Sequence, residues 1–194
     1  LSLEKENTEL LSIVARSVKE MSEGELLQIE KSRTLDITEE EYFEVIRKKT
    51  ASLISTCCEA GAISVESNQH RENMRKFGEK VGLAFQIKDD IFDYGSPNNI
   101  GKPTGIDIRE QKLTLPLIYT LRNAPVKVQK ELKRIIKNKN EEAKMIKRAT
   151  QLVIEYGGIS YAFDRMNILA QEAREILKGY PDNDSKLALL GLVD

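Results

Sequence analysis

The spacing of apolar residues is the feature that most limits how this chain folds. Leu10, Val14, Val18 and Met21 recur at intervals of four, four and three, which places them on one face of a helix. No segment alternates convincingly with the period of two that is typical of a strand. The sequence therefore predicts an all-α protein without internal repeats.

Capping residues, glycines and prolines indicate where the helices end. Thr38 is followed by three glutamates and forms a capping box, so a helix is expected to begin at about residue 39. Gly24 opens a continuation of the first helix or a short second helix, and Gly61 marks a bend or an end. After a helix at about 68–94 and a loop at 94–105, further helices are expected at roughly 108–122, 126–138, 141–156, 159–178 and 184–192.

Two of these helices have apolar faces that are expected to be buried. In the helix that begins at residue 39 the face comprises Phe43, Ile46, Leu53, Ile54 and Cys57. In the helix at 68–94 it comprises Met74, Phe77, Val81, Phe85 and Ile91. Gly78 and Gly82 lie four apart in the second helix, and such a pair indicates the close approach of another backbone or of a ligand.

Composition excludes some classes of function. The 194 residues contain 30 Lys and Arg against 31 Asp and Glu, and this balance argues against general affinity for nucleic acid or anionic membranes. No apolar stretch approaches the length needed to span a membrane. The adjacent Cys57 and Cys58 point in different directions on a helix, so both are expected to be reduced packing residues. We therefore expect a cytoplasmic protein in which any phosphate chemistry must come from local clusters of charged residues.

The segment FQIKDDIFDY carries the clearest chemical signal. Asp89 and Asp93 are four residues apart, so both carboxylates project from one face of a helix, roughly 6 Å apart along its axis. Asp90 reaches the edge of that face, and Gln86 lies one turn earlier. Carboxylates this close repel unless they share a cation, and Mg²⁺ takes such oxygen ligands together with phosphate and water. An exposed acidic turn is the alternative, but the apolar neighbours favour a Mg²⁺-diphosphate site.

A basic loop follows the acidic segment. Lys102 is flanked by Gly101 and Pro103, and Lys112 lies ten residues further on. A lysine in such a loop can fold over a phosphate group because it presents a compact charge with three donors. A plain turn is the alternative; the position directly after the aspartates favours a phosphate-binding role.

A second basic cluster, Arg47 to Ala51, lies within the helix that begins at residue 39. Lys49 and Thr50 border the apolar face of that helix and could contact phosphate oxygens. Three cations in a row are more often a solvated surface, so periodicity alone favours the surface interpretation.

Together these elements resemble the trans-isoprenyl diphosphate synthases, also called polyprenyl synthetases. The matching strings are GELLQ (24–28), KTA (49–51), GLAFQIKDDIFDY (82–94) and GKPTGIDIREQKLTLPLIY (101–119). They cover about the middle half of the chain. The form of the last string looks more like bacterial medium- or long-chain enzymes, such as octaprenyl diphosphate synthase, than like eukaryotic farnesyl synthases.

The resemblance implies an all-α fold of antiparallel helices around a deep cavity, in a protein that is usually a homodimer. It also implies a reaction in which an allylic diphosphate ionises while Mg²⁺ holds the leaving pyrophosphate, and isopentenyl diphosphate attacks the cation. Metal ions and lysines at such a site stabilise the charge that develops on the leaving group.

The resemblance also implies roles for individual residues. Asp89 and Asp93 match the metal-facing acids of the family's second aspartate-rich motif, with Asp90 in support, and Asp107 matches an acid that is expected to position the loop. The residues expected to bind the allylic diphosphate are Lys49, Thr50, Gln86, Lys102 and Lys112. For Lys49 and Thr50 this replaces the surface interpretation.

The sequence departs from the family in one respect. Family members carry an earlier aspartate-rich motif with basic segments on both sides, and nothing before residue 24 resembles it. We therefore expect residues 1–194 to be the C-terminal part of a single polyprenyl synthetase domain that lacks its N-terminal helices. This chain by itself is expected to be inactive.

Two other functions compete with catalysis. A non-catalytic subunit of a heteromeric prenyl synthase tends to lose the aspartates, whereas this chain retains all three and both loop lysines. A terpene cyclase or a squalene-synthase relative also uses aspartate-rich helices, but the GKPTGID loop and the Lys49-Thr50 pair argue against it.

Overall fold

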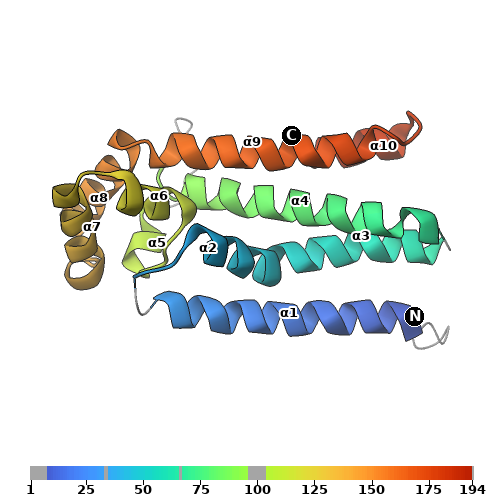
Figure 1. Ribbon diagram of the computed structural model, residues 1–194, viewed down its shortest axis with the longest axis horizontal. Helices are drawn as coiled ribbons and strands as arrows, with labels where there is room; N and C mark the ends of the chain where they lie inside the picture. The colour runs from blue at the N-terminus through green and yellow to red at the C-terminus, as the bar shows by residue number, and fades with distance from the viewer. Residues whose placement is uncertain (1–7, 33–34, 66, 96–103, 194) are drawn as a thin grey trace. The chain divides into compact units, whose positions relative to one another are not determined.

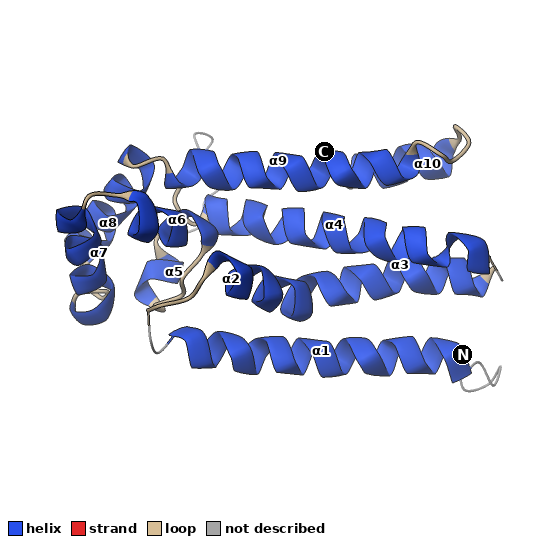
Figure 2. Ribbon diagram, viewed as in Figure 1, coloured by secondary structure: helices blue, strands red, loops and turns tan. Residues whose placement is uncertain are grey.

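The structure is a computed structural model that describes residues 8–32, 35–65, 67–95 and 104–193. Within these residues it contains helices and loops and no strand, which confirms the all-α prediction (Figure 2). Within the same residues, no helix combines the length and apolar character needed to cross a membrane. In chain order (Figure 1) the helices are α1 (Thr8–Ser32), α2 (Glu39–Ile46), the π-helical turn η1 (Arg47–Ala51), α3 (Ser52–Ser64), α4 (Asn68–Phe92), α5 (Ile106–Arg109), α6 (Leu115–Asn123), α7 (Val126–Asn138), α8 (Ala143–Glu155), α9 (Gly158–Leu177) and α10 (Asp184–Gly191).

The predicted capping box at the start of α2 is present. The backbone N–H of Glu41 donates to Thr38 Oγ1 over 3.1 Å, and the Glu41 carboxylate accepts the Thr38 N–H over 2.8 Å. These bonds satisfy two backbone donors that a helix start leaves without partners. They fix the first turn of α2 at the predicted residue.

The π-helical turn η1 interrupts the helix that was predicted from residue 39. A π-turn contains about one residue more than an α-turn, so it changes which side chains face inward. After η1 the buried positions include Ser52, Ser55 and Thr56, whereas Leu53 is 47% exposed and Cys57 is exposed. The prediction that Leu53 and Cys57 are buried was therefore wrong, because it assumed an uninterrupted α-helix.

The chain divides into two compact units. Unit 1 comprises residues 1–27, 44–86 and 167–194, and unit 2 comprises residues 28–43 and 87–166.

Close helix packing in unit 1 depends on glycines. A Cβ atom on Gly82 would lie 2.6 Å from the Ala51 Cα, and one on Gly78 would lie 2.7 Å from the Ser55 Cα. Both distances are too short for a real side chain, so the predicted close approach of another backbone is confirmed. Gly61 has no neighbour of this kind, and α3 continues past it to Ser64, so of the two predictions for Gly61, a bend or an end, the end was wrong.

The apolar face of α4 rotates along the helix. Phe77 and Val81 are buried in a core that includes Ala173 and Leu177 of α9. Each step of four residues advances about 40° beyond a full turn, so Phe85 lies roughly 80° from Phe77 around the helix axis. Phe85 is 57% exposed, and the prediction that it is buried was wrong for this reason.

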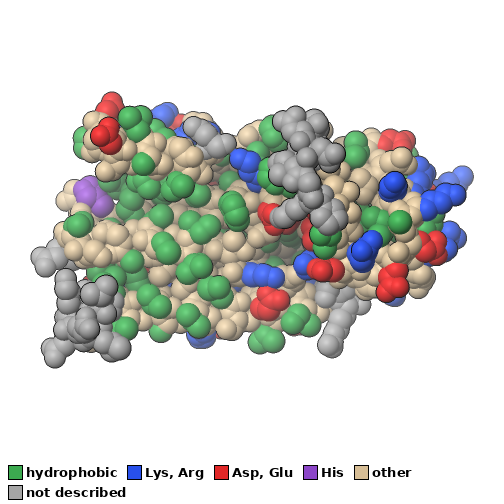
Figure 3. All heavy atoms as spheres, turned by 180° about the vertical axis from the view of Figure 1, so that it is seen from behind, with side chains coloured by type: hydrophobic (Ala, Val, Ile, Leu, Met, Phe, Trp, Pro, Cys, Tyr) green, Lys and Arg blue, Asp and Glu red, His purple; other side chains and the backbone are tan. Residues whose placement is uncertain are grey.

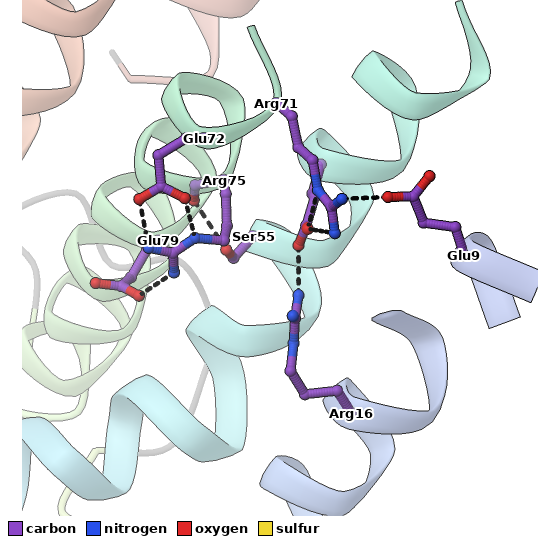
Figure 4. Close-up of polar contacts among 8 residues, drawn as sticks. Glu9, Arg16, Ser55, Arg71, Glu72, Arg75 and Glu79 are labelled. Carbon is purple, nitrogen blue, oxygen red and sulfur yellow. Dashed lines mark hydrogen bonds and ion pairs between the residues drawn. The ribbon is translucent and has the colours of Figure 1, made fainter. Parts of the chain in front are cut away.

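A buried carboxylate links three helices of unit 1 (Figure 4). Glu59 of α3 is 2% exposed and accepts hydrogen bonds from Arg16 of α1 over 2.5 Å and from Arg71 of α4 over 2.7 Å. Arg71 also pairs with Glu9 of α1. The two arginines supply the opposite charge that a buried carboxylate requires.

In unit 2, the helix predicted at 108–122 is two helices. α5 ends at Arg109, and α6 begins at Leu115 with Pro116 in its first turn, where the missing proline N–H is not needed. The side chains of Leu117, Leu132 and Leu152 are almost fully buried in α6, α7 and α8.

The outer faces of α7 and α8 are basic. Figure 3 shows Lys and Arg side chains gathered over these helices. The exposed basic residues of α7 are Lys127, Lys130, Lys133, Arg134 and Lys137. The near-neutral net charge of the chain therefore hides a strong local imbalance in unit 2.

Candidate active site

The three aspartates of the acidic segment lie in different environments at the end of α4. Asp89 is exposed, Asp90 is 6% exposed, and Asp93 is half-buried. The helix was expected to continue to residue 94, but it ends at Phe92, and Asp93 lies in the following turn. The three carboxylates therefore differ in what they can contact.

Asp90 points into unit 2 and meets a tyrosine there. The Tyr42 hydroxyl of α2 donates a 2.7 Å hydrogen bond to Asp90 Oδ2, and Tyr42 is 3% exposed. Burial and the neighbouring Asp90 charge hold the pKa of Tyr42 well above its usual value, so the hydroxyl remains a donor at neutral pH.

Asp93 holds the backbone that follows the basic loop. Its Oδ1 accepts the N–H of Ile106 over 2.9 Å, and its Oδ2 accepts the N–H of Asp107 over 3.0 Å. The backbone carbonyl of Asp93 also accepts the N–H of Gly105 over 2.8 Å. Gly105 adopts a φ of +78°, and a Cβ there would lie 2.3 Å from the Ile146 side chain, so this position requires glycine. Both features fix where residues 105–107 run.

Asp107 adds a fourth carboxyl group to this part of unit 2. Burial, together with the charges of Asp93 and Asp90, raises the pKa of Asp107 to about 7. The pKa of Asp93 is also raised, chiefly by burial, although its two backbone hydrogen bonds act in the opposite direction. For both carboxyl groups burial is the first cause, and for Asp107 the charges of Asp93 and Asp90 act in the same direction.

Of the two predicted loop lysines, one lies beside these acids. Lys112 Nζ is 2.5 Å from Glu110 Oε2 and 4.0 Å from Asp107 Oδ1. Lys102 lies outside the described residues.

The remaining predicted substrate-binding residues belong to unit 1. Thr50 Oγ1 donates a 2.9 Å hydrogen bond to Gln86 Oε1, which brings this predicted pair together. Lys49 Nζ lies 2.7 Å from Glu25 Oε2. Lys49 and Glu25 line an open, mostly apolar pocket of about 550 Å³, together with Met21, Ser22 and Leu26.

Two kinds of metal site are possible for the acids of unit 2. A cation bound jointly by these acids and a phosphate fits them better than a cation bound by protein ligands alone. Among the described residues, no three His, Cys, Asp or Glu side chains are arranged to hold a metal by themselves. Mg²⁺ does not need such a cage, because it usually takes one or two carboxylates and completes its shell with phosphate oxygens and water. The exposed Asp89 and the raised pKa of Asp107 fit this arrangement.

Sequence reasoning missed two residues at these positions. Tyr42 is one of several apolar or aromatic residues in α2. The sequence offers one indication of its contact, which is that a buried tyrosine hydroxyl needs a hydrogen-bond partner. Glu25 lies in the GELLQ string but was not assigned a contact. Its pairing with Lys49 depends on the close approach of α1 to η1, where a Cβ on Gly24 would lie 2.6 Å from the Lys49 backbone nitrogen.

Comparison with known proteins identifies the family. The polyprenyl synthetase family model matches residues 1–153. The chain is 36% identical to a short chain isoprenyl diphosphate synthase of Methanothermobacter thermautotrophicus, in an alignment that covers 96% of this chain and 57% of that protein. It is 30% identical to the octaprenyl diphosphate synthase of Haemophilus influenzae, with the same coverage of each chain.

Solved structures agree on the fold. The polyprenyl synthase of Caulobacter crescentus, crystallised with calcium and isoprenyl diphosphate, matches with a TM-score of 0.91 and 34% identity over 98% of this chain and 59% of that one. The chain thus spans somewhat more than half the length of these relatives. From the family match and this structural similarity, we conclude that the chain has the all-helical isoprenoid synthase fold and belongs to the polyprenyl synthetase family.

Proposed function

We propose that the natural protein containing this chain is a Mg²⁺-dependent trans-prenyltransferase. It condenses isopentenyl diphosphate with an allylic diphosphate to make a longer polyprenyl diphosphate. The observation that carries this proposal is the group of Asp89, Asp90 and Asp93 at the end of α4, in a member of the polyprenyl synthetase family.

Each predicted site residue has a proposed role. Asp89 and Asp93 face the metal with Asp90 in support, and Asp93 also holds residues 105–107 in place through its hydrogen bonds. The hydrogen bond between Thr50 and Gln86 supports a shared role, because it orients a hydroxyl and an amide together. The residues proposed to bind the allylic diphosphate are Lys49, Thr50, Gln86, Lys102 and Lys112.

These roles suit the proposed chemistry. The bond between the allylic carbon and the diphosphate oxygen breaks, the isopentenyl double bond attacks the resulting carbocation, and a proton then passes from the condensed cation to the released pyrophosphate. Bound Mg²⁺ would neutralise charge on the departing pyrophosphate. Lysines that bind the diphosphate, as proposed for Lys49, Lys102 and Lys112, would donate hydrogen bonds that strengthen as charge develops.

Several finer properties stay predictions. The string GKPTGIDIREQKLTLPLIY favours a medium- or long-chain product, whereas the relatives include both a short-chain enzyme and an octaprenyl synthase. The homodimer and the cytoplasmic location also stay predictions. So does the assignment of residues 1–194 to the C-terminal part of one synthase domain.

The replacement Asp89→Ala tests the proposed site. In the natural protein it is expected to reduce the rate of prenyl transfer by at least about a hundredfold, because an acid that acts on the leaving group is lost. The measurement is the incorporation of labelled isopentenyl diphosphate into extended product, with and without Mg²⁺.

Asp164→Ala is the matched control, because it removes an exposed aspartate of unit 2 that belongs to α9 and not to the acidic segment. It is expected to leave the rate unchanged. If the Asp89→Ala variant transfers the prenyl group as fast as the natural protein does, the site assignment is wrong. The 194-residue chain by itself is expected to show no turnover, because it carries only one aspartate-rich motif.

A further inference from the structure

One contact of the candidate site involves a residue with no role in the proposed reaction. Tyr42 donates its hydroxyl to Asp90 over 2.7 Å, and the two residues are 3% and 6% exposed. A buried carboxylate is unfavourable unless it receives hydrogen bonds, and a donor to a charged acceptor forms a shorter and stronger bond than a neutral pair. The Tyr42 hydroxyl therefore strongly favours one orientation of the Asp90 side chain.

The helix that carries Tyr42 is held firmly at its first turn. The capping box joins Thr38 to Glu41, and Glu41 also accepts a 2.5 Å hydrogen bond from Lys31 of α1. The Glu39 carboxylate accepts the Tyr161 hydroxyl of α9 over 2.7 Å and 2.8 Å. Side chains on a well-held element can orient a functional group more closely than side chains on a loop.

Asp90 in turn belongs to the last turn of α4, between Asp89 and Asp93. Rotation of that turn about the helix axis would redirect Asp89 and would displace Asp93 from the backbone of residues 105–107. A bond that fixes Asp90 therefore also limits the direction in which its neighbours point. Residues that hydrogen-bond to metal-binding side chains have this effect in other proteins. Their loss typically reduces metal affinity by about ten- to a hundredfold.

We propose that Tyr42 is a positioning residue of the metal-diphosphate site and that it acts through Asp90. The Tyr42 hydroxyl anchors Asp90 on the protein side of α4, and this anchor sets the orientation in which Asp89 and Asp93 face metal and diphosphate. The inference rests on the proposed function, and it assigns the supporting role of Asp90 to this bond.

Tyr42→Phe tests the inference in the natural protein, because it removes the hydroxyl and keeps the ring. The first measurement is the affinity for Mg²⁺ in the presence of inorganic pyrophosphate. Calorimetry measures this affinity in the absence of turnover. The replacement is expected to weaken Mg²⁺ binding by about tenfold. It is also expected to raise the Mg²⁺ concentration for half-maximal prenyl transfer by a similar factor, while the KM for isopentenyl diphosphate changes by less than about threefold.

Tyr94→Phe is the matched control. Tyr94 is 5% exposed, and its hydroxyl lies 3.2 Å from Thr114 Oγ1, so the replacement also removes a buried hydroxyl contact of unit 2. It is expected to leave Mg²⁺ binding unchanged. If Tyr42→Phe binds Mg²⁺ as the unchanged protein does, or if Tyr42→Phe and Tyr94→Phe weaken binding equally, the inference is wrong.

A double replacement separates positioning from a general loss of stability. When Asp90 is replaced by Ala, Tyr42 has no carboxylate to anchor, so adding Tyr42→Phe is expected to weaken Mg²⁺ binding by less than about twofold. A further tenfold loss in that background would contradict the inference.

A second comparison applies if Tyr42→Phe does not fold. Asn at position 90 still accepts a hydrogen bond from Tyr42, whereas Ala does not. Asp90→Asn is therefore expected to weaken Mg²⁺ binding several-fold less than Asp90→Ala, and equal losses would overturn the inference.

Failure of the inference can be distinguished from failure of the proposed function. If Asp89→Ala does not reduce prenyl transfer, the proposed site is wrong. If Asp89→Ala reduces the rate and Tyr42→Phe leaves Mg²⁺ binding unchanged, only the positioning role of Tyr42 is wrong.

Discussion

At the scale of single residues, Asp107 shows how strongly the acids of unit 2 affect one another. Its pKa is about 7 in the folded protein and 3.8 for the ordinary side chain, chiefly because of burial and the charges of Asp93 and Asp90. Between these pH values the folded state binds more protons than the unfolded state. The contribution of this group to stability therefore falls as the pH rises from about 4 to about 7.

Asp107→Asn is accordingly expected to increase the free energy of unfolding at pH 8 and to leave it nearly unchanged at pH 4. The pKa difference of about three sets an upper limit of about 4 kcal/mol on the gain at pH 8. Urea unfolding without divalent cations, at both pH values, measures it. Asp164→Asn on α9 is the control. If the stability of the Asp107→Asn variant depends on pH in the same way as that of the unchanged protein, the expectation is wrong.

The residues of the candidate site could be predicted from the sequence only in part. The spacing of the aspartates and their apolar neighbours was sufficient to select Asp89, Asp90 and Asp93. It could not show that Asp90 turns toward Tyr42, because this contact joins residues 48 apart in sequence. Nor could it show that Asp93 accepts backbone N–H groups from residues 106 and 107.

At the scale of helices, close packing in unit 1 makes two glycines respond differently to the same change. Both Gly61 and Gly82 lie inside α-helices, where alanine is intrinsically favoured over glycine by about 0.5–1 kcal/mol. A Cβ on Gly61 meets no atom within 4 Å, whereas one on Gly82 would meet the Ala51 Cα at 2.6 Å.

Gly61→Ala is therefore expected to raise the free energy of unfolding by about 0.5–1 kcal/mol. Gly82→Ala is expected to lower it by about 1–3 kcal/mol, because η1 and α4 must move apart. Urea unfolding of both variants checks the two signs. Equal stabilisation by both replacements would show that the contact at Gly82 is not tight.

Helix boundaries were predictable where local chemistry sets them. The capping box at Thr38 marks the start of α2, and the start of α7 at Val126 follows Pro125. The break between α5 and α6 was not predicted, because Ile106, Leu113 and Leu117 recur at intervals of seven and four, as on one helix face, although the backbone is not helical between Arg109 and Leu115. The π-turn at 47–51 has no recognised sequence signal, and it changed which residues of α3 are buried.

At the scale of the whole molecule, the all-helical fold followed from the spacing of apolar residues, and the family followed from short strings in the middle half of the chain. The family match extends over residues 1–153, and the structural match covers 98% of the chain. Prenyl transfer is a proposal for the natural protein, and this chain spans 57% of the length of the two relatives from Methanothermobacter thermautotrophicus and Haemophilus influenzae. In that proposal Asp89 and Asp93 bind a metal together with a diphosphate.

The most direct measurement is a crystal structure of the natural protein grown with Mn²⁺ and inorganic pyrophosphate, in which anomalous scattering locates the metal. We predict a Mn²⁺ ion bound to an Asp89 carboxylate oxygen at about 2.1 Å and to a pyrophosphate oxygen, with Asp93 facing the same ion. Mn²⁺ and pyrophosphate bound together at a place that involves neither Asp89 nor Asp93 would contradict the account.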